Sequence, residues 1–176
     1  MAFRKFLETS DQRELIIMRG VSGTGKSTRA RQLAATGGDI FSTDDFFGQG
    51  ADYHKNYNPD RLAEAHQWNI ARVEQAMEAA RSPIIVDNTN IMPYEAKPYV
   101  LLAKQYGYAV RIEEPQSDHW RQVQNHQKQL QALSSELAGK NLHGAPPDRI
   151  SQMISQYHPY GLEDIEKSVA PWEAND

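Results

Sequence analysis

A glycine-rich string near the N-terminus constrains this chain more than any other feature. Its residues, in order, are Gly20, Val21, Ser22, Gly23, Thr24, Gly25, Lys26 and Ser27, which match the pattern G-x-x-x-x-G-K-[ST]. A buried-strand pattern, Leu15 to Met18, enters the string, and a helical pattern leaves it. In that context the string predicts a phosphate-binding loop between a strand and a helix.

The residue types of this loop suit contact with a triphosphate. The three glycines let the backbone curve closely, so that its N–H groups point at phosphate oxygens, and the helix N-terminus adds favourable partial charge. Lys26 would supply a positive charge to the β and γ oxygens, and Ser27 a magnesium ligand, while Thr28 continues the helix. We therefore expect ATP and Mg²⁺ as cofactors, held by residues 20–28.

Apolar runs alternate with helical patterns along the chain. Strands are expected at Glu14–Arg19, Asp39–Ser42, Ser82–Val86 and Tyr108–Ile112. Helices are expected at Lys26–Ala35, Pro59–Arg81, Pro93–Gln105, Asp118–Ala138 and Pro147–Tyr157. This order predicts a three-layer α/β domain with a mainly parallel sheet. Without a linker, the 176 residues are expected to form a single domain with a core of about 14–158.

Composition narrows the class of protein further. The absence of cysteine excludes disulfides, thiolate nucleophiles and cysteine metal sites, and suits a cytoplasmic location. No apolar run has the length of a signal peptide core or a membrane span, so no membrane partner is expected. The formal charge of −4 argues against a strongly basic nucleic-acid binder. It comes from the tail 161–176, which we interpret as a solvated end.

Carboxylates follow two of the expected strands. Asp44 and Asp45 come where the second strand ends, and Asp87 where the third ends, at the sheet edge where open α/β folds bind ligands. Asp44 is predicted to act on an acceptor hydroxyl, whereas an ordinary helix cap is favoured for Asp45. Asp87 would hold magnesium through water or position Asp44 and substrate. The alternative for Asp87 is a turn acid satisfied by local N–H groups.

Other polar residues allow two interpretations each. His66 and Asn69 lie on the apolar stripe of the helix that begins at Pro59, so they are either satisfied core polar groups or partners of the Asp44 loop and the acceptor. His54, Lys55 and Tyr57 would meet an acceptor strand by stacking and phosphate contact, or belong to an exposed loop.

Several strings, taken together, resemble a known family. These are the phosphate loop, STDDFF from Ser42, AHQWN at 65–69, PIIVDNTN at 83–90, KPYV at 97–100 and NLHGAP at 141–146. They resemble the polynucleotide 5′-hydroxyl kinase family, in particular the kinase domain of Nedd-four-binding protein two and its small relatives, over residues 14–158. The resemblance implies an adenylate-kinase-like P-loop fold, ATP and magnesium, Asp44 as general base and a mobile helical lid near Lys140–Gly144.

The chain departs from the phage member of that family at two places. Phe47 stands where that enzyme has an arginine that recognises a nucleic-acid phosphate, and Lys140 and His143 stand where it has lid arginines. We expect a kinase that transfers the γ-phosphate to the 5′-hydroxyl of single-stranded nucleic acid, with Lys26, Lys140 and His143 stabilising the transferred charge. The alternatives are a kinase for a small hydroxylated metabolite or nucleotide sugar, and a catalytically weak ATP-binding switch or adaptor.

Overall fold

A parallel sheet forms the centre of the molecule. The structure is a computed structural model that describes residues 12–125, 130–141 and 144–173. In these residues the strands are β1 (Glu14–Met18), β2 (Asp39–Phe41), β3 (Ile84–Val86) and β4 (Ala109–Glu113). Their order in the sheet is β2-β3-β1-β4, and all neighbours run parallel. The expected strands therefore exist, each within two residues of its predicted ends.

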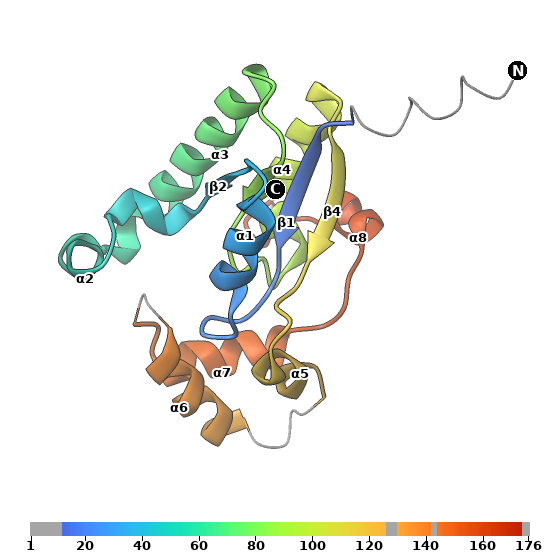
Figure 1. The fold of residues 1–176 in the computed structure, drawn as a ribbon. Helices are drawn as coiled ribbons and strands as arrows, with labels where there is room; N and C mark the ends of the chain where they lie inside the picture. The colour runs from blue at the N-terminus through green and yellow to red at the C-terminus, as the bar shows by residue number, and fades with distance from the viewer. Residues whose placement is uncertain (1–11, 126–129, 142–143, 174–176) are drawn as a thin grey trace, which may run out of the picture.

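Helices cover both faces of this sheet (Figure 1). On one face lies α1 (Lys26–Ala34), and on the other lie α3 (Leu62–Glu78), α4 (Pro93–Tyr106) and α8 (Leu162–Lys167). Strand β1 shows why both faces are covered, because Leu15 and Ile17 face the second group of helices while Ile16 and Met18 face α1. A strand buried on both faces reads as a continuous apolar run. The predicted three-layer α/β class is confirmed.

Prolines open two helical segments where they are predicted to, although α3 itself begins at Leu62, three residues after Pro59. The Asn58 side chain accepts a hydrogen bond from the Asp60 N–H at 2.9 Å, which opens the short 3₁₀ helix η2 (Pro59–Arg61) just ahead of α3. Pro93 occupies the first position of α4, where its missing N–H has no cost, and Glu95 accepts from the Met92 N–H at 2.7 Å. These caps fix where the chain enters η2 and α4.

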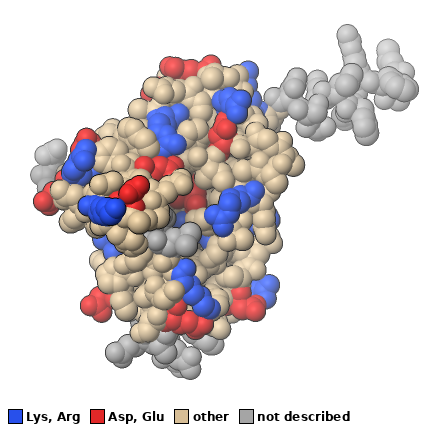
Figure 2. All heavy atoms as spheres, turned by 60° about the vertical axis from the view of Figure 1, so that its left-hand side comes forward, with Lys and Arg blue, Asp and Glu red and all other residues tan. Residues whose placement is uncertain are grey.

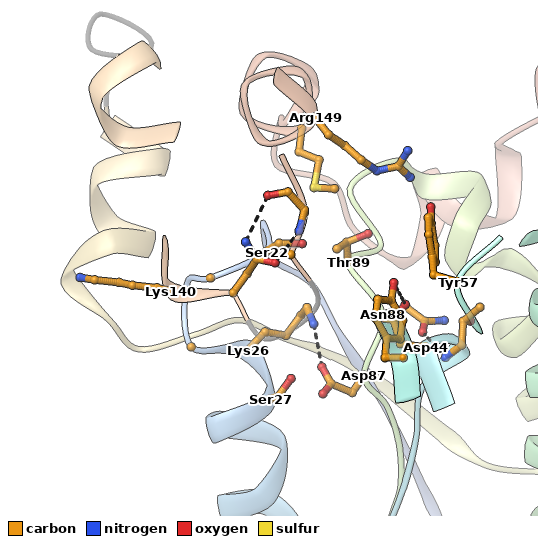
Figure 3. Close-up of a pocket in the computed structure, with 18 of the residues that line it drawn as sticks. Ser22, Lys26, Ser27, Asp44, Tyr57, Asp87, Asn88, Thr89, Lys140 and Arg149 are labelled. Atoms are coloured by element: carbon orange, nitrogen blue, oxygen red, sulfur yellow. Dashed lines mark hydrogen bonds and ion pairs between the residues drawn. The ribbon is translucent and has the colours of Figure 1, made fainter. Parts of the chain in front are cut away.

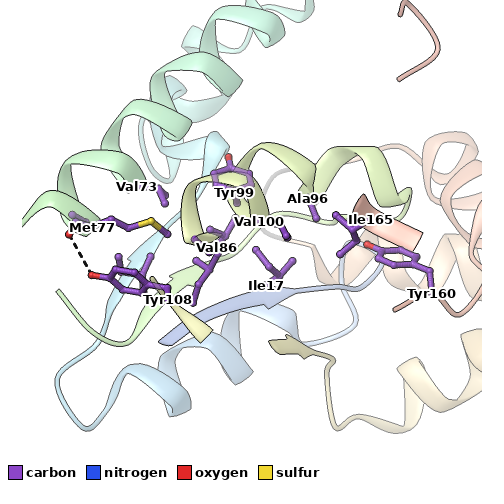
Figure 4. Close-up of a cluster of buried hydrophobic side chains, with 14 residues drawn as sticks. Ile17, Val73, Met77, Val86, Ala96, Tyr99, Val100, Tyr108, Tyr160 and Ile165 are labelled. Carbon is purple, nitrogen blue, oxygen red and sulfur yellow. Dashed lines mark hydrogen bonds between the residues drawn. The ribbon is translucent and has the colours of Figure 1, made fainter. Parts of the chain in front are cut away.

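The tail departs from the expected solvated end. It contains α8, whose Ile165 is fully buried against α4 and β1 residues of the main core, beside Tyr160 (Figure 4). Lys97 also donates to the Ser168 carbonyl at 2.5 Å. Up to residue 173, where the described part of the tail ends, its acidic side chains are exposed, as their charge predicts, but single apolar residues between them bind the segment to the core.

Replacing Ile165 with Ala is expected to lower the free energy of unfolding by about 3 kcal/mol, because it leaves a cavity in the main core. Urea denaturation followed by circular dichroism measures this loss. Leu162→Ala is the matched control, since Leu162 lies in the same helix and is 36% exposed. Equal, small effects of the two substitutions would mean that the tail does not contribute to the core.

A helical hairpin replaces the single long helix expected at Asp118–Ala138. The chain forms α5 (Asp118–Asn125) and α6 (Leu130–Lys140), and His119 Nε2 lies 2.8 Å from Glu136 Oε1. In one continuous helix, residues 17 apart would be separated by about 25 Å at 1.5 Å per residue. Trp120 and Val123 of α5 and Leu137 of α6 are buried together, so the two helices pack on each other.

Short helices complete the fold at the edge of the sheet where the strands end. After β2 come the 3₁₀ helix η1 (Thr43–Phe47) and α2 (Ala51–Asn56), and α7 (Pro147–Gln156) packs on α6. His54 and Lys55, for which an exposed loop was one of two alternatives, therefore lie in a helix, and Tyr57 directly follows it. Within residues 12–125, 130–141 and 144–173, no helix is both long and apolar enough to cross a membrane.

Candidate active site

A cavity of about 540 Å³ opens at the carboxyl end of the strands. It is lined by the phosphate loop, by the loops that follow β2 and β3, by α2 and by the start of α7. Asp44 and Asp87 therefore share one cavity with Lys26, as their positions at neighbouring strand ends predict. The volume is typical of a site for a small molecule or nucleotide.

The phosphate loop has the curved backbone that its glycines permit. Gly23 and Gly25 have φ angles of 85° and 90°, in the left-handed region that favours glycine. A Cβ added to Gly23 would lie 2.5 Å from the Leu137 carbonyl oxygen, so α6 packs directly on the loop. At the other side, the Ser117 hydroxyl donates to the Thr24 carbonyl at 2.6 Å. Helix α6 and Ser117, the residue before α5, thus hold the loop from outside.

The predicted loop residues divide into two groups. Ser22, Gly23, Gly25, Lys26, Ser27 and Thr28 line the cavity. Gly20, Val21 and Thr24 face the interior. Val21 and Thr24 are almost fully buried, and the Thr24 hydroxyl donates to the Val21 carbonyl at 2.7 Å. Any contribution of these two residues to phosphate binding would come from their backbone, because their side chains support the turn.

Lys26 forms an ion pair with Asp87 across the cavity floor (Figure 3). Its Nζ lies 2.8 Å from Asp87 Oδ1, and the two side chains are only 12% and 8% exposed. The predicted alternative, in which local N–H groups satisfy Asp87, does not describe this structure, because the carboxylate accepts from a lysine 61 residues away. A triphosphate entering the loop would compete with Asp87 for the lysine charge.

Asp44 is held in place by its neighbours at the start of η1. Ser42 caps this helix, its hydroxyl accepting from the Asp44 N–H at 3.3 Å. Asn88, in the loop after β3, accepts from the Thr43 N–H at 2.9 Å and so ties η1 to that loop. The Tyr53 hydroxyl donates to Asp44 Oδ1 at 3.4 Å. Burial raises the pKa of Tyr53, and the charge of Asp44 raises it further, so Tyr53 stays a donor.

Asp45 has a structural role, as expected of a cap. Its carboxylate accepts from the Ser42 N–H at 3.4 Å and pairs with Arg72 at 3.2 Å. The two adjacent acids are therefore distinct, since Asp44 lines the cavity and Asp45 does not.

The structure separates His66 from Asn69. Asn69 is fully buried, donates to the Tyr99 hydroxyl at 3.0 Å and does not line the cavity, which fits a satisfied core polar group. His66 lines the cavity, with Nδ1 3.4 Å from the Thr43 hydroxyl oxygen. Removal of water lowers the pKa of His66, against the opposing charge of Asp44. The ring is therefore a neutral partner of the Asp44 loop near neutral pH.

Of the two residues predicted to act from the lid, only Lys140 lies in the described part of the chain. Lys140 lines the cavity, but its Nζ lies 3.0 Å from Glu136 and 2.7 Å from His119 Nε2, and Figure 3 shows it directed away from Lys26. Its predicted role requires the amine to leave this pair. His143 lies outside the described residues. Both catalytic assignments remain predictions.

Arg149 lines the cavity although no pattern in the sequence singles it out, and the same is true of Arg31 and Glu95. Arg149 belongs to the first turn of α7, and its guanidinium extends over the cavity toward Tyr57 (Figure 3). It comes three residues after the NLHGAP string, within the predicted helix Pro147–Tyr157, where a lone exposed arginine carries no pattern of its own. Only the packing of α7 on α6 brings it to the site.

The donor set fits magnesium carried by a nucleotide. Among the described residues there is no group of three or more His, Cys, Asp or Glu side chains that would hold a metal alone. Ser27 and Asp87 line the cavity beside Lys26, and Mg²⁺ commonly takes one or two protein oxygens together with phosphate oxygens and water. Ser27, with Asp87 through water, would hold such an ion.

Comparisons with known proteins place this fold and loop in a family. A family model described as an AAA domain matches residues 15–154. The chain belongs to this AAA domain family. It is 39% identical over 145 residues to human NEDD4-binding protein 2, an alignment that covers 81% of the chain. The chain spans only 8% of that relative's length.

Solved structures share the P-loop kinase-like fold of this AAA domain. A chain of the Pnkp1/Rnl/Hen1 RNA repair complex superimposes with a TM-score of 0.59 at 18% identity, covering 92% of this chain and 47% of that one. A chain in a second Pnkp1/Rnl/Hen1 structure has a TM-score of 0.50 at 25% identity, covering 71% and 43%. These comparisons confirm the family resemblance and the predicted fold class.

Proposed function

We propose that this AAA domain is an ATP-dependent kinase that transfers the γ-phosphate to the 5′-hydroxyl of a polynucleotide. The observation that carries the proposal is the cavity itself, in which Lys26 and Ser27 of the phosphate loop face Asp44 and Asp87. A phosphate loop by itself indicates only that a triphosphate binds. A carboxylate at the acceptor end of the cavity adds a group that can take the proton of a hydroxyl, as a kinase requires.

In the proposed reaction the acceptor oxygen attacks the γ-phosphorus in line. A new O–P bond forms, the bond to the β-phosphate oxygen breaks, and ADP leaves. Asp44 orients the hydroxyl and accepts its proton, and Lys26 neutralises charge on the β and γ oxygens once it leaves Asp87. Tyr53, as a donor to Asp44, keeps the carboxylate aimed at the acceptor.

A second candidate is a kinase for a small hydroxylated metabolite or nucleotide sugar. On the face shown in Figure 2, acidic and basic side chains are interspersed rather than gathered into a basic track. Phe47, which replaces the phosphate-binding arginine of the phage enzyme, is 1% exposed and packs in the aromatic cluster of η1 and α2. The strings resembling the polynucleotide 5′-hydroxyl kinase family favour the polynucleotide acceptor.

Labelled ATP offered with 5′-hydroxyl DNA and RNA oligomers, beside a panel of sugars and nucleosides, tests the proposal. Label transferred to the 5′ end of an oligomer is the expected result. Transfer only to a sugar or nucleoside would favour the second candidate. ATP binding without transfer to any acceptor would favour a switch or adaptor and overturn both kinase proposals.

A further inference from the structure

The cavity extends beyond Asp44 to an end that the phosphate-transfer residues do not use. Tyr53 and His54 of α2, Tyr57 directly after it, and Arg149 of α7 line this end. His54 also approaches the loop before α7, because a Cβ added to Gly144 would lie 3.0 Å from the His54 ring. Two aromatic residues, an imidazole and a guanidinium thus surround the space next to Asp44.

Arg149 brings a positive charge to the cavity. Within the described ranges, no hydrogen bond or ion pair forms at its guanidinium, whereas Arg19, Arg29, Arg72 and Arg111 each pair with a carboxylate. Burial raises the pKa of Glu95 and of Tyr53, and the charge of Arg149 opposes both shifts. The positive charge of Arg149 therefore affects groups inside the cavity, although the residue also contacts solvent.

Tyr57 presents an aromatic ring whose position is fixed. It packs edge-on against Phe47, with ring centroids 5.2 Å apart, and tilted against Tyr53 at 5.4 Å. It nevertheless remains 38% exposed, and it lines the cavity on the side toward which Arg149 points. An exposed ring held by other rings can stack on a nucleobase at low entropic cost.

The direction of the acceptor follows from the reaction. If its 5′-hydroxyl lies between Asp44 and the γ-phosphate, the rest of the first nucleotide must extend away from Lys26. Figure 3 shows Tyr57 and the Arg149 guanidinium on that side of the cavity. A guanidinium presents a planar pair of N–H donors that matches phosphate oxygens, and an aromatic ring matches any base.

Building on the kinase function proposed above, we propose that Arg149 and Tyr57 form the binding site for the first nucleotide of the acceptor. Arg149 binds the phosphate on its 3′ side, and Tyr57 stacks on its base. With both charge signs mixed over the face in Figure 2, recognition concentrates on this nucleotide rather than on a long strand.

Binding of two probes, a 5′-hydroxyl dinucleotide and the corresponding nucleoside without phosphate, tests the site by calorimetry. Arg149→Ala is expected to weaken dinucleotide binding by about 10- to 100-fold and to leave nucleoside binding unchanged, because only the dinucleotide carries the phosphate. Arg81→Ala is the matched control, since this exposed arginine pairs with Asp39 at the opposite end of β2. Equal dinucleotide affinities of Arg149→Ala and the wild type, or no binding by the wild type, would overturn the site.

Stacking is tested separately at Tyr57. Tyr57→Leu is expected to weaken both probes by about tenfold, whereas Tyr57→Phe keeps the ring and should bind both normally. Thermal melting of both variants verifies that the aromatic cluster remains folded. Normal binding by a folded Tyr57→Leu variant would rule out stacking.

Transfer assays with the same probes keep the two proposals distinguishable. A wild type that phosphorylates neither probe, yet loses dinucleotide binding on Arg149→Ala, would contradict the kinase function and leave the nucleotide site supported. A wild type that phosphorylates the dinucleotide with a KM unchanged by Arg149→Ala would do the reverse.

Discussion

Replacing Asp44 with Asn is expected to lower kcat for phosphoryl transfer by about 10²- to 10⁴-fold, the usual contribution of a general base. The amide keeps the size of the side chain and can still accept from Tyr53, but it cannot take the proton of the acceptor hydroxyl. ATP binding should change little, because Asp44 belongs to the acceptor side of the cavity. Steady-state rates with labelled ATP and a 5′-hydroxyl oligomer give kcat and both KM values.

The adjacent acid provides the control for this substitution. Asp45→Asn removes the same charge one residue away, but Asp45 pairs with Arg72 and does not line the cavity. It should reduce stability slightly and leave kcat within a few-fold. If Asp44→Asn keeps the wild-type kcat while Asp45→Asn loses it, the two assignments are reversed. If both variants remain fully active, neither acid is the base.

Replacing Lys26 with Ala should have two separable effects. It removes the lysine charge that would neutralise the β and γ phosphate oxygens. This loss is expected to lower kcat/KM by about 10²-fold or more. The substitution also leaves Asp87, with a side chain only 8% exposed, without its ion-pair partner. Removing one partner of a buried pair commonly costs about 3 kcal/mol of unfolding free energy.

A double variant separates these effects. Lys26→Met combined with Asp87→Asn removes both charges of the pair, so urea denaturation should show a recovery of stability relative to Lys26→Ala. Activity should remain lost, because no cation faces the phosphates. Recovery of activity together with stability would mean that Lys26 serves only to hold Asp87, and it would contradict its role in the phosphate loop.

The strands and the phosphate loop were predictable because their signals are local. Leu15 to Met18 must be buried on both faces of a sheet, and Gly23 and Gly25 take backbone angles that other residues disfavour. Parallel strands end at one edge, so the approach of Asp44 to Asp87 also followed from the chain order. The starts of η2 and α4 followed from Pro59 and Pro93 in the same way.

Features that depend on distant partners were not predictable. The polar pattern of Asp118–Ala138 favours helix throughout, and only burial of Trp120 against Leu137 and the α7 residues explains the hairpin of α5 and α6. The acidic tail was expected to be solvated. Ile165 contributes one apolar side chain among many charges, and its burial depends on packing against α4, which no local pattern reveals.

The sequence by itself determined that this chain has a phosphate loop entering a parallel α/β sheet, with carboxylates at the neighbouring strand ends. Short-range backbone preferences and burial periodicity are sufficient for that. Only the tertiary structure decided that Lys26 pairs with Asp87, that Asn69 belongs to the core, and that Arg149 faces Tyr57 across the cavity. These relations join residues far apart along the chain, and their geometry depends on how whole helices pack.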